Sequence, residues 1–294
     1  MKRVFLFLAT NLAILILLGV VSAVLQGYLA DQGIEFERLG LLVFAGVFGM
    51  GGSFISLALS KWMALRATGA QVIESPTNDT EHWLVETVRQ HAQAAGIGMP
   101  QVAIFPSGSP NAFATGARRD AALVAVSSGL LEGMKRDEIS AVLGHEVSHI
   151  ANGDMVTLTL IQGVLNTFVL FFSRIVGEFI DRAVFRNQNG RGMGYFAATI
   201  FSQIVLGALA SLVVMWFSRQ REFRADAGGA NLAGRQGMID ALRRLGSLSE
   251  RSEPLPKQMA AAGVSGGRGG MSQLFASHPP LEERIRRLEM DEAR

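Results

Sequence analysis

Long apolar runs alternate with mixed polar and apolar segments along this chain, and the runs set its predicted architecture. Four runs are almost free of charge and longer than the about 20 residues that a helix needs to cross a bilayer: residues 4–29, 39–60, 155–180 and 195–217. Arg174 and Glu178 weaken the third run near its end. We predict four transmembrane helices, with buried helices of a soluble core as the alternative for the third and fourth runs.

The first run follows Lys2 and Arg3, as the apolar part of a signal peptide also would. It is longer than the about 7–15 residues typical of signal peptides, and the second run follows after a short loop at 30–38. We therefore expect an uncleaved membrane anchor.

Two mixed segments lie between and after the apolar runs. In residues 61–154 the pattern predicts helices and strands in this order: a helix at 80–95, a strand at 101–105, a loop at 106–116, a strand at 121–126 and a helix at 137–151. Asp137 is the expected N-cap of that last helix.

After the fourth run, residues 218–294 contain two predicted helices at 218–233 and 236–245, then a Gly- and Ser-rich stretch at 263–270. A last charged helix is expected to begin at Pro279 and Pro280. The chain thus divides into four parts: 1–60, 61–154, 155–217 and 218–294. The predicted fold class is mainly α with a small β-sheet, and the two mixed segments can build one domain if an even number of crossings separates them.

Composition favours a membrane protein over a soluble one, because 49% of the residues are hydrophobic and only 18% are charged. The formal net charge of +2 gives no support for nucleic-acid binding. Basic residues gather at the run ends that we assign to the cytoplasm: Lys2, Arg3, Lys61, Arg66, Arg219, Arg221 and Arg224. The loop between the third and fourth runs opposes this topology, because it contains Arg182, Arg186 and Arg191.

Candidate chemistry centres on His145-Glu146-Val147-Ser148-His149, an H-E-x-x-H motif. On a helix this spacing puts both imidazoles on one face beside a carboxylate, which is the arrangement of a catalytic zinc site. The chain has only five histidines and no cysteine, so a metal would be held by histidine and carboxylate ligands. The alternative is a partly buried helix that happens to carry two histidines and a surface glutamate.

A catalytic zinc site needs three protein ligands and one open position. No further histidine follows at short spacing, and the best third ligand is Glu222, which shares a helix face with Asp226. We expect Asp226 to accept a hydrogen bond from the far nitrogen of His145 or His149, and Asp154 also to orient a ligand. The alternative is an exposed acidic pair balanced by the neighbouring arginines.

Chemistry suggests roles for two more residues. Glu146 follows a ligand directly and can act as a general base and then as a general acid. A donor must also stabilise the oxyanion, and both tyrosines, Tyr28 and Tyr195, lie at the edges of apolar runs. His278 is the better donor by elimination, unless it only caps the helix that follows Pro279.

A peptide substrate would bind in an extended form along an edge strand beside the metal. Asn111, Ala112, Phe113 and Ala114 are the candidates for that edge, although a simple loop explains them equally well. His82 and His91 lack partners at ligand spacing, and we expect both to be solvated.

Small residues recur in the second apolar run at every fourth position, at Ala45, Gly49 and Ser53. This spacing predicts close helix packing, either within the chain or between copies of it, so self-association stays open.

Three motifs in order resemble the HtpX family of bacterial membrane zinc metalloproteases, which are related to the CAAX prenyl proteases: H-E-V-S-H, then E-F-R-A-D, then S-H-P-P-L-E-E-R-I. The resemblance covers essentially the whole chain. It implies a four-span protein of the bacterial inner membrane with a cytosolic zincin-like domain built from two sequence blocks. It also implies one Zn²⁺ per chain with Glu222 as third ligand, His278 as the donor, and residues 111–114 bordering the cleft.

The function that this resemblance implies is hydrolysis of misfolded or damaged membrane proteins at the cytoplasmic face, in quality control and stress response. Its expected partners are unfolded or membrane protein substrates and membrane lipid. One alternative is a zinc-binding membrane scaffold without catalysis, which would have no need of Glu146 as a base. The other is a CAAX-type protease of prenylated peptides, whose membrane chamber takes more than four spans in the relatives.

Overall fold

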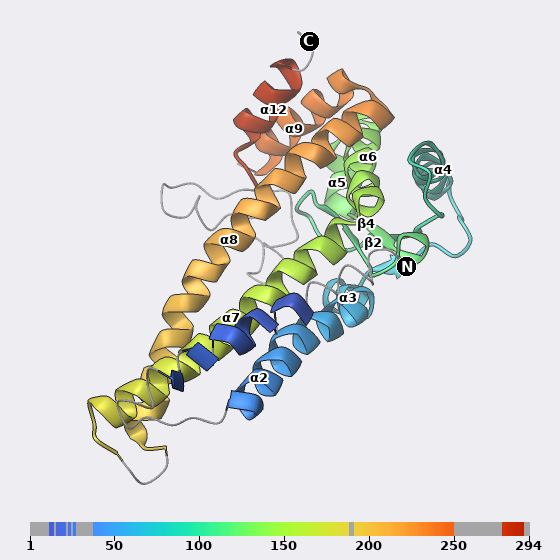
Figure 1. Cartoon of the computed structure of the whole chain (residues 1–294). Helices are drawn as coiled ribbons and strands as arrows, with labels where there is room; N and C mark the ends of the chain where they lie inside the picture. Colours follow the sequence, from blue (N-terminus) through green and yellow to red (C-terminus); the bar gives the residue numbers. More distant parts are fainter. Residues whose placement is uncertain are drawn as a thin grey trace. The chain divides into compact units, whose positions relative to one another are not determined.

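The computed structural model describes residues 12–27 except 15, 22 and 25, together with residues 38–187, 191–249 and 278–290. These residues are mainly helical, with one four-stranded sheet (Figure 1). The chain forms two compact units. We call Met1–Ser56 with Thr159–Val214 the apolar unit, and Leu57–Leu158 with Met215–Arg294 the α/β unit.

Three stretches of helix are long and apolar enough to cross a membrane: Leu39–Thr68, Asp154–Ala183 and Met193–Ala233. The first comprises α2 (Arg38–Gly46), a π-helical turn η1 (Val47–Gly51) and α3 (Gly52–Thr68), and the others are α7 (Asp154–Ala183) and α8 (Met193–Ala233). Of the first predicted span, 4–29, a short apolar helix at Leu12–Val21 is described. Residues 4–11, 15, 22, 25, 28 and 29 of that span, Tyr28 among them, and the loop at 30–37 lie outside the described residues.

The predicted close packing at Ala45, Gly49 and Ser53 is confirmed, and its partner within the apolar unit is α7. A side chain on Gly49 would collide with the backbone and hydroxyl of Thr167. Ser53 donates to the Gly49 carbonyl at 3.2 Å, and Ala45 is fully buried beside the α7 residue Phe171. Small residues let the two helix backbones approach, as in other membrane helix pairs.

The sheet of the α/β unit has the order β1-β2-β4-β3. Its strands are β1 (Gln71–Val72), β2 (Gln101–Phe105), β3 (Ala112–Thr115) and β4 (Leu123–Ser127). Strands β2 and β4 are parallel, whereas β3 pairs antiparallel with β4 and forms an edge of the sheet. The strand at 101–105 is confirmed, the second strand begins two residues later than predicted, and the segment predicted as a loop contains β3.

Helix α6 (Arg136–Asn152) contains the H-E-x-x-H motif and packs against the sheet and α4 (Asp79–Ala94). The prediction that Asp137 is the N-cap is wrong. The helix begins at Arg136, because the Glu138 carboxylate accepts a hydrogen bond from the Lys135 backbone at 2.8 Å and closes the first turn. Its apolar face is buried, and a fully buried Leu143 contributes about 1.5–3 kcal/mol to stability.

The predicted helix at 218–233 is the last part of the 41-residue helix α8 and not a separate element. Gly234, with φ of 92°, ends α8, and α9 (Arg235–Ser249) follows. The last helix, α12 (Leu281–Met290), lies beside α9 (Figure 1). The remaining described elements are η2 (Arg119–Ala121) and α5 (Ser128–Gly133). The Gly- and Ser-rich stretch at 263–270 lies outside the described residues.

His82 is exposed as predicted, but the prediction that His91 is solvated is wrong. His91 is buried between α4 and α6, where its Nε2 lies 3.0 Å from the Ser140 carbonyl and 3.1 Å from the Ser140 hydroxyl. Burial lowers the pKa of His91 below the ordinary histidine value. Its position four residues after Thr87 places it on the buried face of α4, which the lack of a ligand partner could not reveal.

Candidate metal centre

Two helices of the α/β unit bring three possible ligands together. Helix α6 supplies His145 and His149, whose Nε2 atoms lie 3.1 Å apart. Helix α8 supplies Glu222, with Oε2 at 3.4 Å from His145 Nε2 and Oε1 at 3.3 Å from His149 Nε2. One ligand atom from each residue lies within 4.8 Å of the others, and all three side chains are buried.

The close crossing of α6 and α8 depends on residues without side chains. A Cβ on Gly228 would collide with the Ser148 side chain, and one on Gly229 would stand 3.0 Å from the His145 backbone nitrogen. Gly144 faces Gly229 from the other helix. The helices therefore approach more closely than side chains would allow, and this lets the Glu222 carboxylate reach both histidines.

A carboxylate holds the outer nitrogen of each histidine. His145 Nδ1 lies 3.0 Å from Asp226 Oδ1, and His149 Nδ1 lies 2.7 Å from Asp154 Oδ2. Asp154 can turn back to His149 because Gly153 ends α6 in the left-handed conformation, with φ of 67°. The structure thus brings Asp226 to His145 and Asp154 to His149.

The donor set fits a divalent metal. Since a carboxylate only accepts hydrogen bonds, each neutral imidazole carries its proton on Nδ1 and presents an Nε2 lone pair to the other. Two lone pairs that face each other at 3.1 Å are compatible only with a proton or a cation between them. The buried Oε1 of Glu222 also forms no hydrogen bond with a described residue. A metal ion would satisfy all three atoms.

Electrostatics in the metal-free centre favour charged groups despite burial. Burial acts to lower the pKa of His145, but Asp226 and Glu222 outweigh it and raise that pKa to about 9. Burial acts to raise the pKa of Glu222, and the nearby His278 and His149 hold that pKa well below the usual range. Metal binding must therefore displace a proton from His145 at neutral pH.

Glu146 and His278 are both buried. The Glu146 side chain is 5% exposed and forms no hydrogen bond or ion pair with a described residue. His278 Nδ1 lies 2.7 Å from Glu222 Oε2, while its Nε2 is buried without a partner among the described residues. His278 is thus in contact with a possible metal ligand. If its Nδ1 donates to Glu222, its Nε2 can donate only from the imidazolium form.

The predicted substrate residues lie at the edge of the sheet. Ala112, Phe113 and Ala114 belong to β3, whose outer side pairs with no other strand in the described part of the chain. Asn111 precedes β3 and is 1% exposed, and neither polar atom of its side chain has a hydrogen-bond partner among the described residues. Helix α6 packs against this strand.

The sequence reasoning missed Arg284, which is fully buried and pairs with Asp226. A signal was present in the sequence. Arg284 occupies a position in the apolar stripe of α12, which otherwise consists of Leu281, Ile285 and Leu288. A charged residue in such a stripe must have a buried partner.

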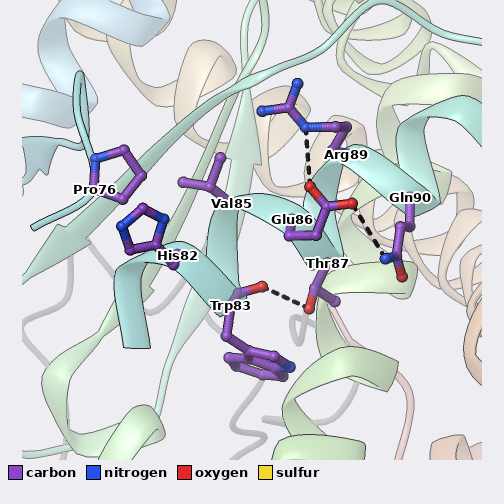
Figure 2. A pocket seen from close by; sticks show the side chains of 8 residues that line it. All are labelled: Pro76, His82, Trp83, Val85, Glu86, Thr87, Arg89 and Gln90. Atoms are coloured by element: carbon purple, nitrogen blue, oxygen red, sulfur yellow. Dashed lines mark hydrogen bonds and ion pairs between the residues drawn. The ribbon is translucent and has the colours of Figure 1, made fainter. Parts of the chain in front are cut away.

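A pocket of about 670 Å³ on α4 contains none of these residues (Figure 2). Three contacts join groups that line it: Glu86 Oε2 lies 3.2 Å from Arg89 Nε, Glu86 Oε1 accepts from Gln90 at 3.3 Å, and Thr87 donates to the Trp83 backbone carbonyl at 2.8 Å. The pocket therefore offers no group of free polar atoms comparable to the metal centre.

Comparisons with known proteins identify the family of this chain. The model of peptidase family M48 matches residues 78–292. Protease HtpX of Alkalilimnicola ehrlichii is 61% identical over 291 residues, which cover 97% of this chain and 96% of that protein. Protease HtpX of Thioalkalivibrio sulfidiphilus is 60% identical over 288 residues, which cover 97% of each chain.

Among solved structures, the crystal structure of S. mikatae Ste24p is similar, with a TM-score of 0.63 and 18% sequence identity. The match covers 98% of this chain and 67% of that chain. At this identity the likeness shows a shared fold.

Proposed function

Because the chain belongs to peptidase family M48, among the HtpX proteases, we propose that it is a zinc-dependent endopeptidase that cuts misfolded or damaged membrane proteins. The proposal that the activity depends on a metal rests on one observation: ligand atoms of two imidazoles and one carboxylate lie within 4.8 Å of one another. Each imidazole also has its own carboxylate partner, as histidine ligands of metals usually do.

His145 and His149 would hold the metal through Nε2, and Glu222 through its carboxylate. Two imidazoles and one carboxylate without a thiol suit zinc, with a fourth position open for water or substrate. When bound, zinc supplies a Lewis acid that polarises the scissile carbonyl and lowers the pKa of a water to about 7.

The chain's own residues would move the protons. Glu146 takes a proton from the attacking water while the water oxygen forms a bond to the carbonyl carbon. It then delivers that proton to the amine nitrogen as the C–N bond breaks, so the reaction consumes one water and regenerates the carboxylate. The burial of Glu146 directly beside the candidate ligand His145 in the sequence supports this role.

We assign His278 to the developing oxyanion. Its Nε2 is buried and lacks a partner among the described residues, and its Nδ1 contacts the ligand Glu222 at 2.7 Å. A donor there would stabilise negative charge that develops only in the transition state.

The substrate would add a strand to β3. The edge of β3, which pairs with no further strand among the described residues, offers backbone hydrogen bonds that do not depend on the sequence of the peptide, and this suits unfolded substrates of many sequences. We assign Asn111 to the same surface, because its buried amide has no partner among the described residues that would otherwise satisfy it.

We place the protein in the bacterial inner membrane as a multi-pass protein, with residues 61–154 and 218–294 forming the catalytic domain in the cytoplasm. Three helices long and apolar enough to span support the membrane location, and the predicted first span would make four. Lys61, Arg66, Arg219 and Arg224 at the ends of these runs support the orientation, because basic residues favour the cytoplasmic side.

The test is zinc content and casein cleavage of the detergent-purified full chain beside Glu146→Gln. We expect about one zinc per chain in both proteins and cleavage by the wild type alone, since the amide cannot take a proton. Cleavage by Glu146→Gln would exclude the proposed base. Zinc in both proteins without cleavage of any protein offered would favour a zinc-binding scaffold.

A further inference from the structure

The C-terminal helix α12 places one charged side chain against the metal centre. Arg284 has no exposed surface and is the largest fully buried side chain in the described part of the protein. Its Nε donates to Asp226 Oδ2 at 2.8 Å, and its Nη2 donates to Asp226 Oδ1 at 2.5 Å. The guanidinium thus donates hydrogen bonds to both oxygens of the Asp226 carboxylate.

Two buried carboxylates lie within ion-pair distance of this cation, and Glu222 also has Arg221 Nε at 3.6 Å. Glu222 and Asp226 lie four residues apart on α8, and like charges at that spacing destabilise a helix. Among the lysines and arginines in the described part of the chain, Arg284 alone lies within ion-pair distance of Asp226. Its Nη2 is also 4.0 Å from Glu222 Oε2. Asp226 and Glu222 raise the pKa of Arg284 despite its burial.

The contacts continue from Arg284 to the metal ligand. Asp226 Oδ1, which Arg284 Nη2 binds, also lies 3.0 Å from His145 Nδ1. A two-pronged arginine contact fixes the plane of a carboxylate, which a single hydrogen bond does not. With Asp226 fixed, the His145 ring is held with Nε2 toward His149 and Glu222.

We propose that Arg284 is a positioning residue of the metal centre, so that the docking of α12 controls how tightly the metal is held. The inference rests on the proposed function, since it assumes that His145, His149 and Glu222 bind zinc. Arg284 would touch neither metal nor substrate and would act through Asp226.

The test is the zinc dissociation constant of the full chain in detergent, measured by competition with a chromophoric chelator. We expect Arg284→Met to weaken zinc binding about 10–100-fold, the usual effect of losing a group that orients a ligand. Arg284→Lys should recover only part of the affinity, because one ammonium cannot span both carboxylate oxygens. The matched control is Arg286→Gln on the exposed face of the same helix, with the wild-type dissociation constant expected.

A second pair of variants separates positioning from folding, because Arg284→Met leaves the Asp226 charge buried without its partner. Asp226→Asn removes that carboxylate charge but leaves the buried Arg284 cation without its partner, whereas the double variant Asp226→Asn with Arg284→Met carries neither charge, and in both the amide oxygen can still accept from His145. If Arg284 acts through Asp226, these two proteins bind zinc equally well. This comparison decides the inference even where Arg284→Met fails to fold.

The visible spectrum of the Co²⁺-substituted proteins gives a readout independent of activity, because it reports the geometry of the ligands. We expect Arg284→Met to change that spectrum and Arg286→Gln to leave it unchanged. Zinc binding as tight as wild type in folded Arg284→Met, with an unchanged spectrum, would overturn the inference while the proposed function stands. A wild-type chain that binds no zinc would instead overturn the proposed function.

Discussion

His149 Nδ1 lies 2.7 Å from Oδ2 of Asp154, the first residue of the helix that follows the H-E-x-x-H helix. Gly153, whose positive φ ends the H-E-x-x-H helix, separates Asp154 from that helix. Asp226 makes the equivalent contact with Nδ1 of His145. Both candidate ligands on α6 are therefore oriented by residues that belong to the long helices α7 and α8.

Replacing Asp154 by Ala is expected to weaken zinc binding about 10–100-fold, because His149 loses the partner that fixes its tautomer. Asp154→Asn should cost less, since the amide oxygen still accepts from Nδ1. The measurement is chelator competition on the purified chain, with Asp240→Asn on the surface of α9 as the control. An unchanged dissociation constant in Asp154→Ala would remove Asp154 from the metal centre.

Replacing His278 by Ala is expected to lower kcat about 10²–10³-fold, the usual loss when one oxyanion donor is removed. Zinc affinity should fall much less, because His278 contacts Glu222 without being a ligand itself. Steady-state cleavage and zinc content of the same preparation separate the two effects, with the exposed His82→Ala as the control. Loss of zinc in parallel with kcat would make His278 a residue that only orients Glu222.

The affinity of the site for zinc is expected to rise with pH. Burial acts to lower the pKa of His145, but Asp226 and Glu222 raise it to about 9, so zinc must displace this proton at neutral pH. For this one proton the affinity should rise about tenfold per pH unit below that pKa. Chelator competition between about pH 6 and pH 9.5 tests the slope. A flat profile would mean that zinc displaces no proton from the ligands.

The raised pKa of His145 has the opposite effect on the stability of the metal-free protein, which falls as the pH rises. A histidine whose pKa is raised in the folded state stabilises that state fully below its ordinary pKa of about 6.5. The stabilisation is lost as the pH rises through about 9. The Tm of the metal-free chain should therefore fall across this interval, while the zinc-loaded chain does not lose this contribution.

Local patterns predicted the parts of this protein that depend on nearby residues. The strand at 101–105 and the helix that contains His145 and His149 follow from spacing alone. The edge strand β3 did not, because Ala112, Phe113 and Ala114 are all buried and show no alternation of buried and exposed positions. Its existence depends on pairing with β4.

The partners of buried charged and polar residues were also not identified by local patterns. Arg284 and His91 both lie on helices that looked solvated, and each is buried because of a partner far away in the sequence: Asp226 for one and Ser140 for the other. The motifs gave the types of ligand. The close crossing that brings them together depends on Gly228 and Gly229, which carry no chemistry of their own.

Replacing Gly228 by Ala therefore tests whether that crossing sets the geometry of the metal centre. The new Cβ would collide with the Ser148 side chain, and such overpacking usually costs about 1–3 kcal/mol. Because the collision pushes α8 away from α6, zinc affinity should fall together with the Tm. Adding Ser148→Gly should restore part of both by making room.

The matched control for Gly228→Ala is Gly237→Ala on α9, where an added Cβ meets no atom closer than 3.9 Å. Alanine is a better helix former than glycine by about 0.5–1 kcal/mol, so this variant should be as stable as the wild type or more stable. Its zinc affinity should stay unchanged. If Gly228→Ala bound zinc as tightly as Gly237→Ala, the spacing of α6 and α8 would not limit the site, because Glu222 could then reach both histidines from a wider crossing.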